Sequence, residues 1–169
     1  METKSARSRT ISWEDPFTVM RAAPGKTGLE LLREISLGQL PPPPIAVLMG
    51  FNGALFEDGR AIFEGEPAEY LYNPIGVVHG GYAMTLLDSA MGCAVQSTLG
   101  VGERYTTLEL KTNFVRPITL DTGRVRSEGL VLHRGTTIAT AEGKLIAIES
   151  GKLLAHGTTT CLIIPARSA

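Results

Sequence analysis

The chain has 169 residues, of which 43% are hydrophobic, and this suits one compact domain with a substantial core. Its formal net charge is −1, so no excess of positive charge argues for a nucleic acid or an anionic membrane as partner. The 2 cysteines and 3 histidines show no metal-ligand spacing, and we expect no metal site. The N-terminus lacks the apolar segment of a signal peptide, and no apolar run could span a bilayer, so we expect a soluble, cytoplasmic protein.

The first 40 residues predict an arm followed by a short helix. Residues 1–26 show little periodicity and are expected to form a loose arm, with a short structured piece near Trp13. Thr27 and Glu30 have the spacing of a capping box, and they open an amphipathic helix that ends at Gly38. Prolines at 41–44 prevent the helix from continuing. We therefore predict a helical extension over residues 1–40 and a main domain over residues 41–169.

The main domain is rich in β-strand signals. Residues 45–56 and 60–66 flank an Asp58-Gly59 pair, which is typical of a hairpin turn. Four further β-rich runs follow, over residues 106–116, 123–133, 136–148 and 152–164. The short connections between these runs predict neighbouring antiparallel strands. The pattern indicates one antiparallel sheet of about six strands.

Residues 80–100 interrupt the β pattern with a predicted helix. Its apolar residues fall on every side of the helical wheel, and such a helix is usually buried all round. A flat sheet of six strands cannot cover it, so the sheet must curl around the helix. The predicted fold class is α+β, with a long central helix wrapped by a curved antiparallel sheet.

Asp88 is the most informative residue of this helix. It lies among Leu87, Met84 and Met91, and we expect it to be buried, where an ionised carboxylate is costly unless it is paired or used in chemistry. It also lies too far into the helix for the N-terminal dipole to stabilise it. The alternative is a carboxylate that caps a neighbouring backbone group or faces solvent on an imperfectly buried helix.

The start of the helix carries a second candidate feature. Gly80 and Gly81 let the backbone approach a ligand and point N–H groups outward, as a developing oxyanion requires; the alternative is a plain strand-to-helix turn. His79 could act as a general base or as a structural hydrogen-bonding residue at the helix entry. Asn73, which precedes a proline, could equally be a loop residue that initiates a turn.

Geometry separates these two features within one chain. Gly81 and Asp88 are seven residues apart, or about 10 Å along a helix axis, whereas the chemistry requires contact within roughly 3–6 Å. If both serve one reaction, Asp88 must come from a second subunit whose helix runs antiparallel beside the first. The sequence therefore predicts a two-fold homodimer with shared sites.

The pattern N-x5-H-G-G-x6-D, from Asn73 to Asp88, together with the strand sequence of residues 107–117, resembles the PaaI-like branch of the hotdog-fold thioesterases, named from phenylacetate degradation. The resemblance covers residues 41–164 and implies hydrolysis of an acyl- or aryl-CoA. Members with an N-terminal extension resemble this chain in the lead-in helix and the prolines. The family commonly assembles dimers into tetramers, which implies a homodimer or a homotetramer here.

The resemblance also implies roles for single residues. Asp88 would activate water or attack the thioester, the Gly80 N–H would polarise the carbonyl with Gly81 close by, and Asn73 would hold the nucleophilic water. A serine or threonine on the next strand orients the carboxylate in this family, and Thr107 fits that position. Adjacent Thr106 is the alternative. In strict alternation Thr107 shares a face with residues 109, 111 and 113.

Substrate contacts follow from the same resemblance. The CoA nucleotide would bind at the turn His133-Arg134-Gly135, although an ordinary hairpin explains this turn as well. Met84, Met91, Phe51 and Phe56 would line an adaptable acyl pocket, which favours medium-chain or aryl groups. No cofactor is expected beyond the coenzyme A of the substrate itself.

Two other functions compete with hydrolysis. A hotdog enoyl-CoA hydratase or dehydratase needs an Asp/His pair at one Cα–Cβ unit, yet His79 lies about 13 Å along the helix from Asp88. A non-catalytic acyl-CoA-binding protein would keep the fold without the chemistry. The presence of the complete set of candidate residues, Asn73, Gly80, Asp88 and Thr107, argues against this alternative.

Overall fold

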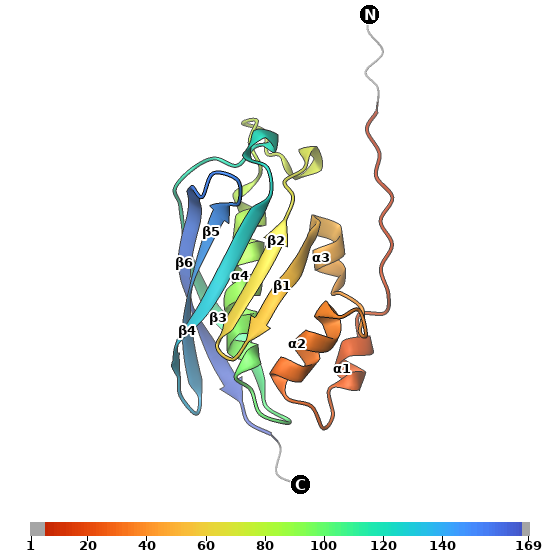
Figure 1. Cartoon of the computed structure of the whole chain (residues 1–169), viewed down its shortest axis with the longest axis vertical. Helices are drawn as coiled ribbons and strands as arrows, with labels where there is room; N and C mark the ends of the chain where they lie inside the picture. Colours follow the sequence, from red (N-terminus) through yellow and green to blue (C-terminus); the bar gives the residue numbers. More distant parts are fainter. Residues whose placement is uncertain (1–5, 167–169) are drawn as a thin grey trace, which may run out of the picture.

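The computed structural model describes residues 6–166; residues 1–5 of the predicted arm and residues 167–169 lie outside the described part. A six-stranded antiparallel sheet curls around one long helix, α4, which spans Gly80–Ser97 (Figure 1). The strands are β1 (Phe51–Glu57), β2 (Arg60–Gly65), β3 (Arg104–Phe114), β4 (Val125–Arg134), β5 (Ile138–Ala147) and β6 (Leu153–Ile164). Two 3-10 turns, η1 (Glu69–Leu71) and η2 (Leu120–Thr122), lie in the connections. The predicted α+β class is confirmed.

The N-terminal region adds three short helices, α1 (Thr18–Ala22), α2 (Gly28–Ser36) and α3 (Pro44–Met49). The predicted capping box is present at the start of α2. Thr27 Oγ1 accepts from Glu30 N at 3.3 Å, and Thr27 N donates to Glu30 Oε2 at 2.7 Å. Helices α2 and α3 lie against β1, so they cover that edge of the sheet (Figure 1).

The predicted strand over residues 45–56 is wrong in its first half, which forms α3. Pro44 occupies the first helical position, where a backbone N–H has no acceptor within the helix, so the N–H that proline lacks costs no hydrogen bond. Gly50 ends the helix with φ +71°, a left-handed conformation that glycine adopts without strain. An apolar run of this length shows no clear period, so its sequence fits a strand as well as a helix.

The strand order is β1-β2-β4-β5-β6-β3, so the predicted neighbour relation between the third and fourth strands is also wrong. Residues 115–124 do not form a tight turn; they cross the end of the sheet through η2 and deliver β4 to the free side of β2. Glu64 and Arg126 face each other in that register and form an ion pair at 2.6 Å. β3 pairs with β6 instead.

Helix α4 forms the centre of the core, but it is not buried on all sides. Leu86, Leu87 and Ala90 have no exposed surface, as expected for a helix inside a curled sheet. Met84 and Asp88, one turn apart, are exposed. The sheet ends at β3, so this strip of α4 runs beside an edge with no further strand.

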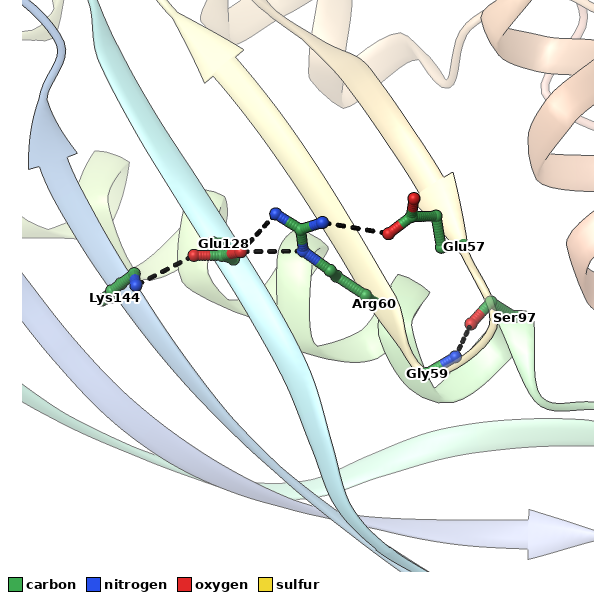
Figure 2. A network of polar contacts seen from close by, with 6 residues as sticks. All are labelled: Glu57, Gly59, Arg60, Ser97, Glu128 and Lys144. Carbon is green, nitrogen blue, oxygen red and sulfur yellow. Dashed lines mark hydrogen bonds and ion pairs between the residues drawn. The ribbon is translucent and has the colours of Figure 1, made fainter.

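The outer face of the sheet carries a network of charged side chains. Arg60 binds both Glu57 and Glu128, and Lys144 reaches the other oxygen of Glu128 at 3.0 Å (Figure 2). These pairs cross β1, β2, β4 and β5. The charged ladder suits contact with water, whereas the edge formed by β3 carries exposed apolar side chains (Leu108 and Phe114, each 56% exposed).

Candidate active site

Asp88 lies on the exposed strip of α4, not in an apolar interior. The expectation of a buried carboxylate is therefore wrong for the single chain, because the sheet leaves this side of the helix open. Thr107 Oγ1 on β3 donates a hydrogen bond to Asp88 Oδ1 at 3.1 Å. The bond holds one carboxylate oxygen and leaves the other free to act on a ligand.

Of the two adjacent threonines, Thr107 makes this contact, although the face predicted for it is wrong. A β-bulge at Leu108 breaks the alternation of β3 between Thr107 and Glu109. Thr107 therefore shares the inward face with Leu110 and Thr112, not with the odd-numbered residues that follow it. The irregularity depends on pairing with β6, which no local pattern in the sequence reveals.

His79 is the N-cap of α4 and has a structural partner. Its Nδ1 accepts a hydrogen bond from Gly81 N at 2.9 Å, so the ring proton lies on Nε2. The Gly81 N–H is thereby already used, and it does not add a second donor for an oxyanion. Gly80, at the first helical position, has an N–H with no acceptor within the helix.

Asn73 holds its own loop through its side-chain oxygen. Oδ1 accepts from Ile75 N at 3.1 Å and from Val77 N at 3.3 Å, which is the turn-forming role weighed from the sequence. Both contacts use the oxygen, so the amide NH2 group is the part that could hold a water molecule.

Asn73 and Gly80 line one pocket of about 440 Å³ at the N-terminal end of α4. The pocket is otherwise mainly apolar, with walls from Val77, Ala83, Phe114, Val115, Ile118 and Leu154. Neither Asp88 nor Thr107 lines it. Gly80 and Asp88 are eight residues apart on α4, which is about 12 Å along the axis. The pocket that contains Asn73 and Gly80 and the carboxylate of Asp88 therefore do not meet within one chain.

The residues predicted to bind substrate lie in different places. Met84 is exposed beside Asp88, whereas Met91 has no exposed surface and packs in the core. Phe51 and Phe56 each pack edge-on against Phe63 inside the sheet. These last three side chains form core structure, and none of them lines the pocket that contains Asn73 and Gly80. These side chains are buried because each points inward from its own helix or strand.

The turn His133-Arg134-Gly135 lies at the opposite end of the molecule from Gly80. Arg134 Nη2 donates a hydrogen bond to Glu103 Oε2 at 2.8 Å, and the guanidinium also contacts the Gly135 carbonyl. A nucleotide phosphate would have to share this guanidinium with a carboxylate. His133 is exposed.

Sequence reasoning missed two neighbours of Asp88, Tyr105 and Cys93. Burial raises the pKa of the Cys93 thiol to about 12, and the charge of Asp88 acts in the same direction, so this thiol is protonated and unsuited to act as a nucleophile. Burial raises the pKa of Tyr105 as well. Gly92, within the helix, was the available signal, because the Tyr105 ring lies where its side chain would be.

Within residues 6–166, no three His, Cys, Asp or Glu side chains cluster as metal ligands would. The helices of this described part include none long and apolar enough to cross a membrane.

Comparisons with known proteins agree with the sequence resemblance. A family model of the thioesterase superfamily matches residues 75–153. A curated relative from Saccharolobus solfataricus, named as a candidate esterase, is 36% identical over 86 residues, which is 51% of this chain and 59% of that relative.

Among solved structures, a conserved protein from Pseudomonas aeruginosa is 33% identical with a TM-score of 0.65, and the match covers 71% of this chain and 93% of that one. A phenylacetic acid degradation-related protein from Ralstonia eutropha is 28% identical with a TM-score of 0.69, covering 78% and 98%. The chain belongs to the thioesterase superfamily and has the hotdog fold that its resemblance to the PaaI-like branch predicts.

Proposed function

We propose that the protein is an acyl-CoA thioesterase that works as a homodimer with composite active sites. Asp88 acts as general base or nucleophile, the Gly80 N–H binds the oxyanion, and Asn73 holds the water. One observation carries the proposal: the pocket of Asn73 and Gly80 and the carboxylate of Asp88 lie about 12 Å apart along one helix. Each is half of a hydrolytic site, and a second copy supplies the missing half.

The sheet has one edge suited to joining the two copies. Helices α2 and α3 cover the β1 edge, whereas β3, the other edge, carries unpaired backbone groups and exposed Leu108 and Phe114 (Figure 1). A long, bare, apolar strand edge favours pairing with another strand. Two copies of β3 paired about a two-fold axis would extend the sheet to both copies and bring their α4 helices side by side, antiparallel.

The contacts inside one chain support one position for the axis of this proposed dimer. Phe114 packs against Gly80, and Thr107 binds Asp88, so residues 107–114 of β3 run beside residues 80–88 of α4. The midpoint of this shared stretch is residue 84 on the helix and residues 110–111 on the strand. A two-fold axis there exchanges Gly80 of one copy with Asp88 of the other, which unites the two halves.

Hydrolysis in such a site balances without a cofactor. The thioester carbonyl oxygen accepts from the Gly80 N–H, and water lies between the Asn73 amide and Asp88 of the second copy. Asp88 takes a proton as the water oxygen bonds to the carbonyl carbon. The C–S bond then breaks, its electron pair goes to sulfur, and the CoA thiolate takes up a proton. In the covalent variant, Asp88 attacks the carbonyl first and water hydrolyses the resulting anhydride.

The test is a panel of acyl-CoAs incubated with purified protein and a thiol reagent. Wild-type protein should release free CoA, and Asp88→Asn, which keeps the shape of the side chain, should lower turnover by about 10²-fold or more. Equal turnover by the variant would remove Asp88 from the chemistry. Loss of enoyl absorbance without CoA release would indicate a hydratase, and tight binding without turnover would indicate a non-catalytic acyl-CoA-binding protein.

A further inference from the structure

We infer that the N-terminal extension closes the far end of the acyl-binding channel, so that the enzyme favours acyl chains of about ten carbons or more. The inference rests on the proposed function and names its substrate class. It concerns a second cavity, of about 590 Å³, which lies between α1 and the C-terminal end of α4. This volume is typical of a small-molecule site.

The walls of this cavity are mainly apolar and come from both parts of the chain. The extension contributes Pro16, Val19, Met20, Ala23 and Pro24, and the main domain contributes Leu99 and Tyr105. The lining contains three charged residues, and two of them are already paired: Lys26 with Glu34, and Glu103 with Arg134. The third, Arg104, is exposed to solvent. An uncharged, flexible chain therefore suits the interior better than a charged ligand.

The extension is fixed firmly at this cavity. Gly28 N, at the start of α2, donates to Leu99 O at 3.0 Å. A Cβ at Gly28 would lie only 1.9 Å from Gln96 O, so the two backbones touch at a position where only glycine fits. The cavity is consequently walled by fixed elements on both sides.

The cavity and Asp88 lie along one face of α4, with the Tyr105 ring between them. Asp88, Gly92 and Gln96 follow at intervals of four residues and share one face of the helix. Gln96 lines the cavity, and the Tyr105 hydroxyl lies over Gly92 at 2.6 Å from where a Cβ would be. Tyr105 is thus a wall of the cavity and also a close neighbour of Asp88.

The proposed dimer brings the reaction centre to the same place. With the axis at residues 110–111, Tyr105 of one copy would lie opposite residue 116 of the other, two residues beyond the end of β3. Residues 114–118 line the pocket of Asn73 and Gly80. The pocket that holds the carbonyl therefore lies beside the second copy's cavity, with Asp88 between them.

The distance sets the length of chain that reaches the cavity. Asp88 and Gln96 are about 12 Å apart along the helix. An extended alkyl chain advances about 1.3 Å per carbon, given its C–C bonds of about 1.5 Å. Chains of about ten carbons or more enter the cavity, and chains of four do not.

The experiment compares Ala23→Phe, which fills the cavity, with Ala22→Phe, whose neighbouring position does not line it. We measure kcat/KM for butyryl-CoA and dodecanoyl-CoA. In Ala23→Phe the dodecanoyl-to-butyryl ratio should fall at least about tenfold, since each methylene kept out of an apolar site forfeits roughly fourfold in affinity. In Ala22→Phe the ratio should remain that of the wild type. Equal ratios in both variants would overturn the inference.

A binding measurement separates this inference from the proposed function. Titration calorimetry with dodecanoate, a product that requires no turnover, should show binding to wild-type protein and at least about tenfold weaker binding to Ala23→Phe. If no acyl-CoA is hydrolysed but dodecanoate binding depends on Ala23, the proposed function fails and the cavity assignment stands. If acyl-CoAs are hydrolysed and Ala23→Phe affects neither chain length nor binding, only the inference fails.

Discussion

Replacing Gly80 by proline removes one hydrogen-bond donor from the proposed site and changes little else. Proline is favoured at the first position of a helix, where its missing N–H has no helical acceptor. The residue before a proline must be extended, and His79 already is, with φ −60° and ψ 136°. Gly81 cannot replace the lost donor, because its N–H is bonded to His79 Nδ1.

The expected loss is that of a single oxyanion donor, about 10²–10³ in kcat, or roughly 2.7–4 kcal/mol of transition-state stabilisation. Gly80→Ala is the matched control, because it adds a Cβ in the same place and keeps the N–H. That Cβ would lie 3.0 Å from Phe114 Cζ, the end of an exposed ring that can shift. The control should retain most of the wild-type rate.

Turnover is followed by CoA release from an acyl-CoA, and unfolding in urea checks that both variants fold alike. Wild-type turnover by Gly80→Pro would refute the assignment of the Gly80 N–H. Equal, large losses in both variants would mean that crowding against Phe114, not the missing donor, lowers the rate.

Three further predictions concern single side chains. Asn73→Asp keeps the oxygen that holds the loop and removes the NH2 donor. Turnover should therefore fall about ten- to a hundred-fold, or roughly 1.4–2.8 kcal/mol, while the stability stays unchanged. An unaffected rate would leave Asn73 as a loop residue. Thr107→Val removes the hydrogen bond to Asp88 and should lower kcat about tenfold. The free energy of unfolding in urea should change by less than about 1.5 kcal/mol. A wild-type kcat in this variant would contradict the role of Thr107. The hydrogen bond from the Gly100 N–H, together with the hydrogen bond and charge of Arg134, holds the pKa of Glu103 below its ordinary value of 4.5. The stability that these contacts add is therefore present above that pH and is lost as the pH falls through the lower folded pKa. The unfolding free energy difference between wild type and Glu103→Gln should therefore be constant above about pH 5 and shrink in more acid solution, whereas growth in acid would contradict the sign.

Local signals in the sequence predicted local structure well. The capping box of Thr27 and Glu30, the Asp58-Gly59 hairpin and the helix that begins at Gly80 each depend on a few adjacent residues. The stretch before β1 was misread, because an apolar run of one turn does not reveal its period.

Features that depend on distant pairing could not be read in the same way. The place of β3 beside β6, its bulge at Leu108 and the resulting exposure of Asp88 all follow from long-range contacts. The Thr107 contact came from family resemblance, whereas strict alternation placed that residue among the wrong neighbours. Tyr105 was missed because its role depends on the gap left by Gly92.

The shared site is tested most directly by mixing two inactive variants, Asp88→Asn and Gly80→Pro. The two proteins are unfolded, combined in equal amounts and refolded, and mass spectrometry of the intact assemblies confirms that mixed dimers form. Each mixed dimer has one site with both defects and one with neither, so about a quarter of all sites should recover activity. If mixed dimers are present and no activity returns, Asp88 and Gly80 do not act on one substrate across the subunit boundary.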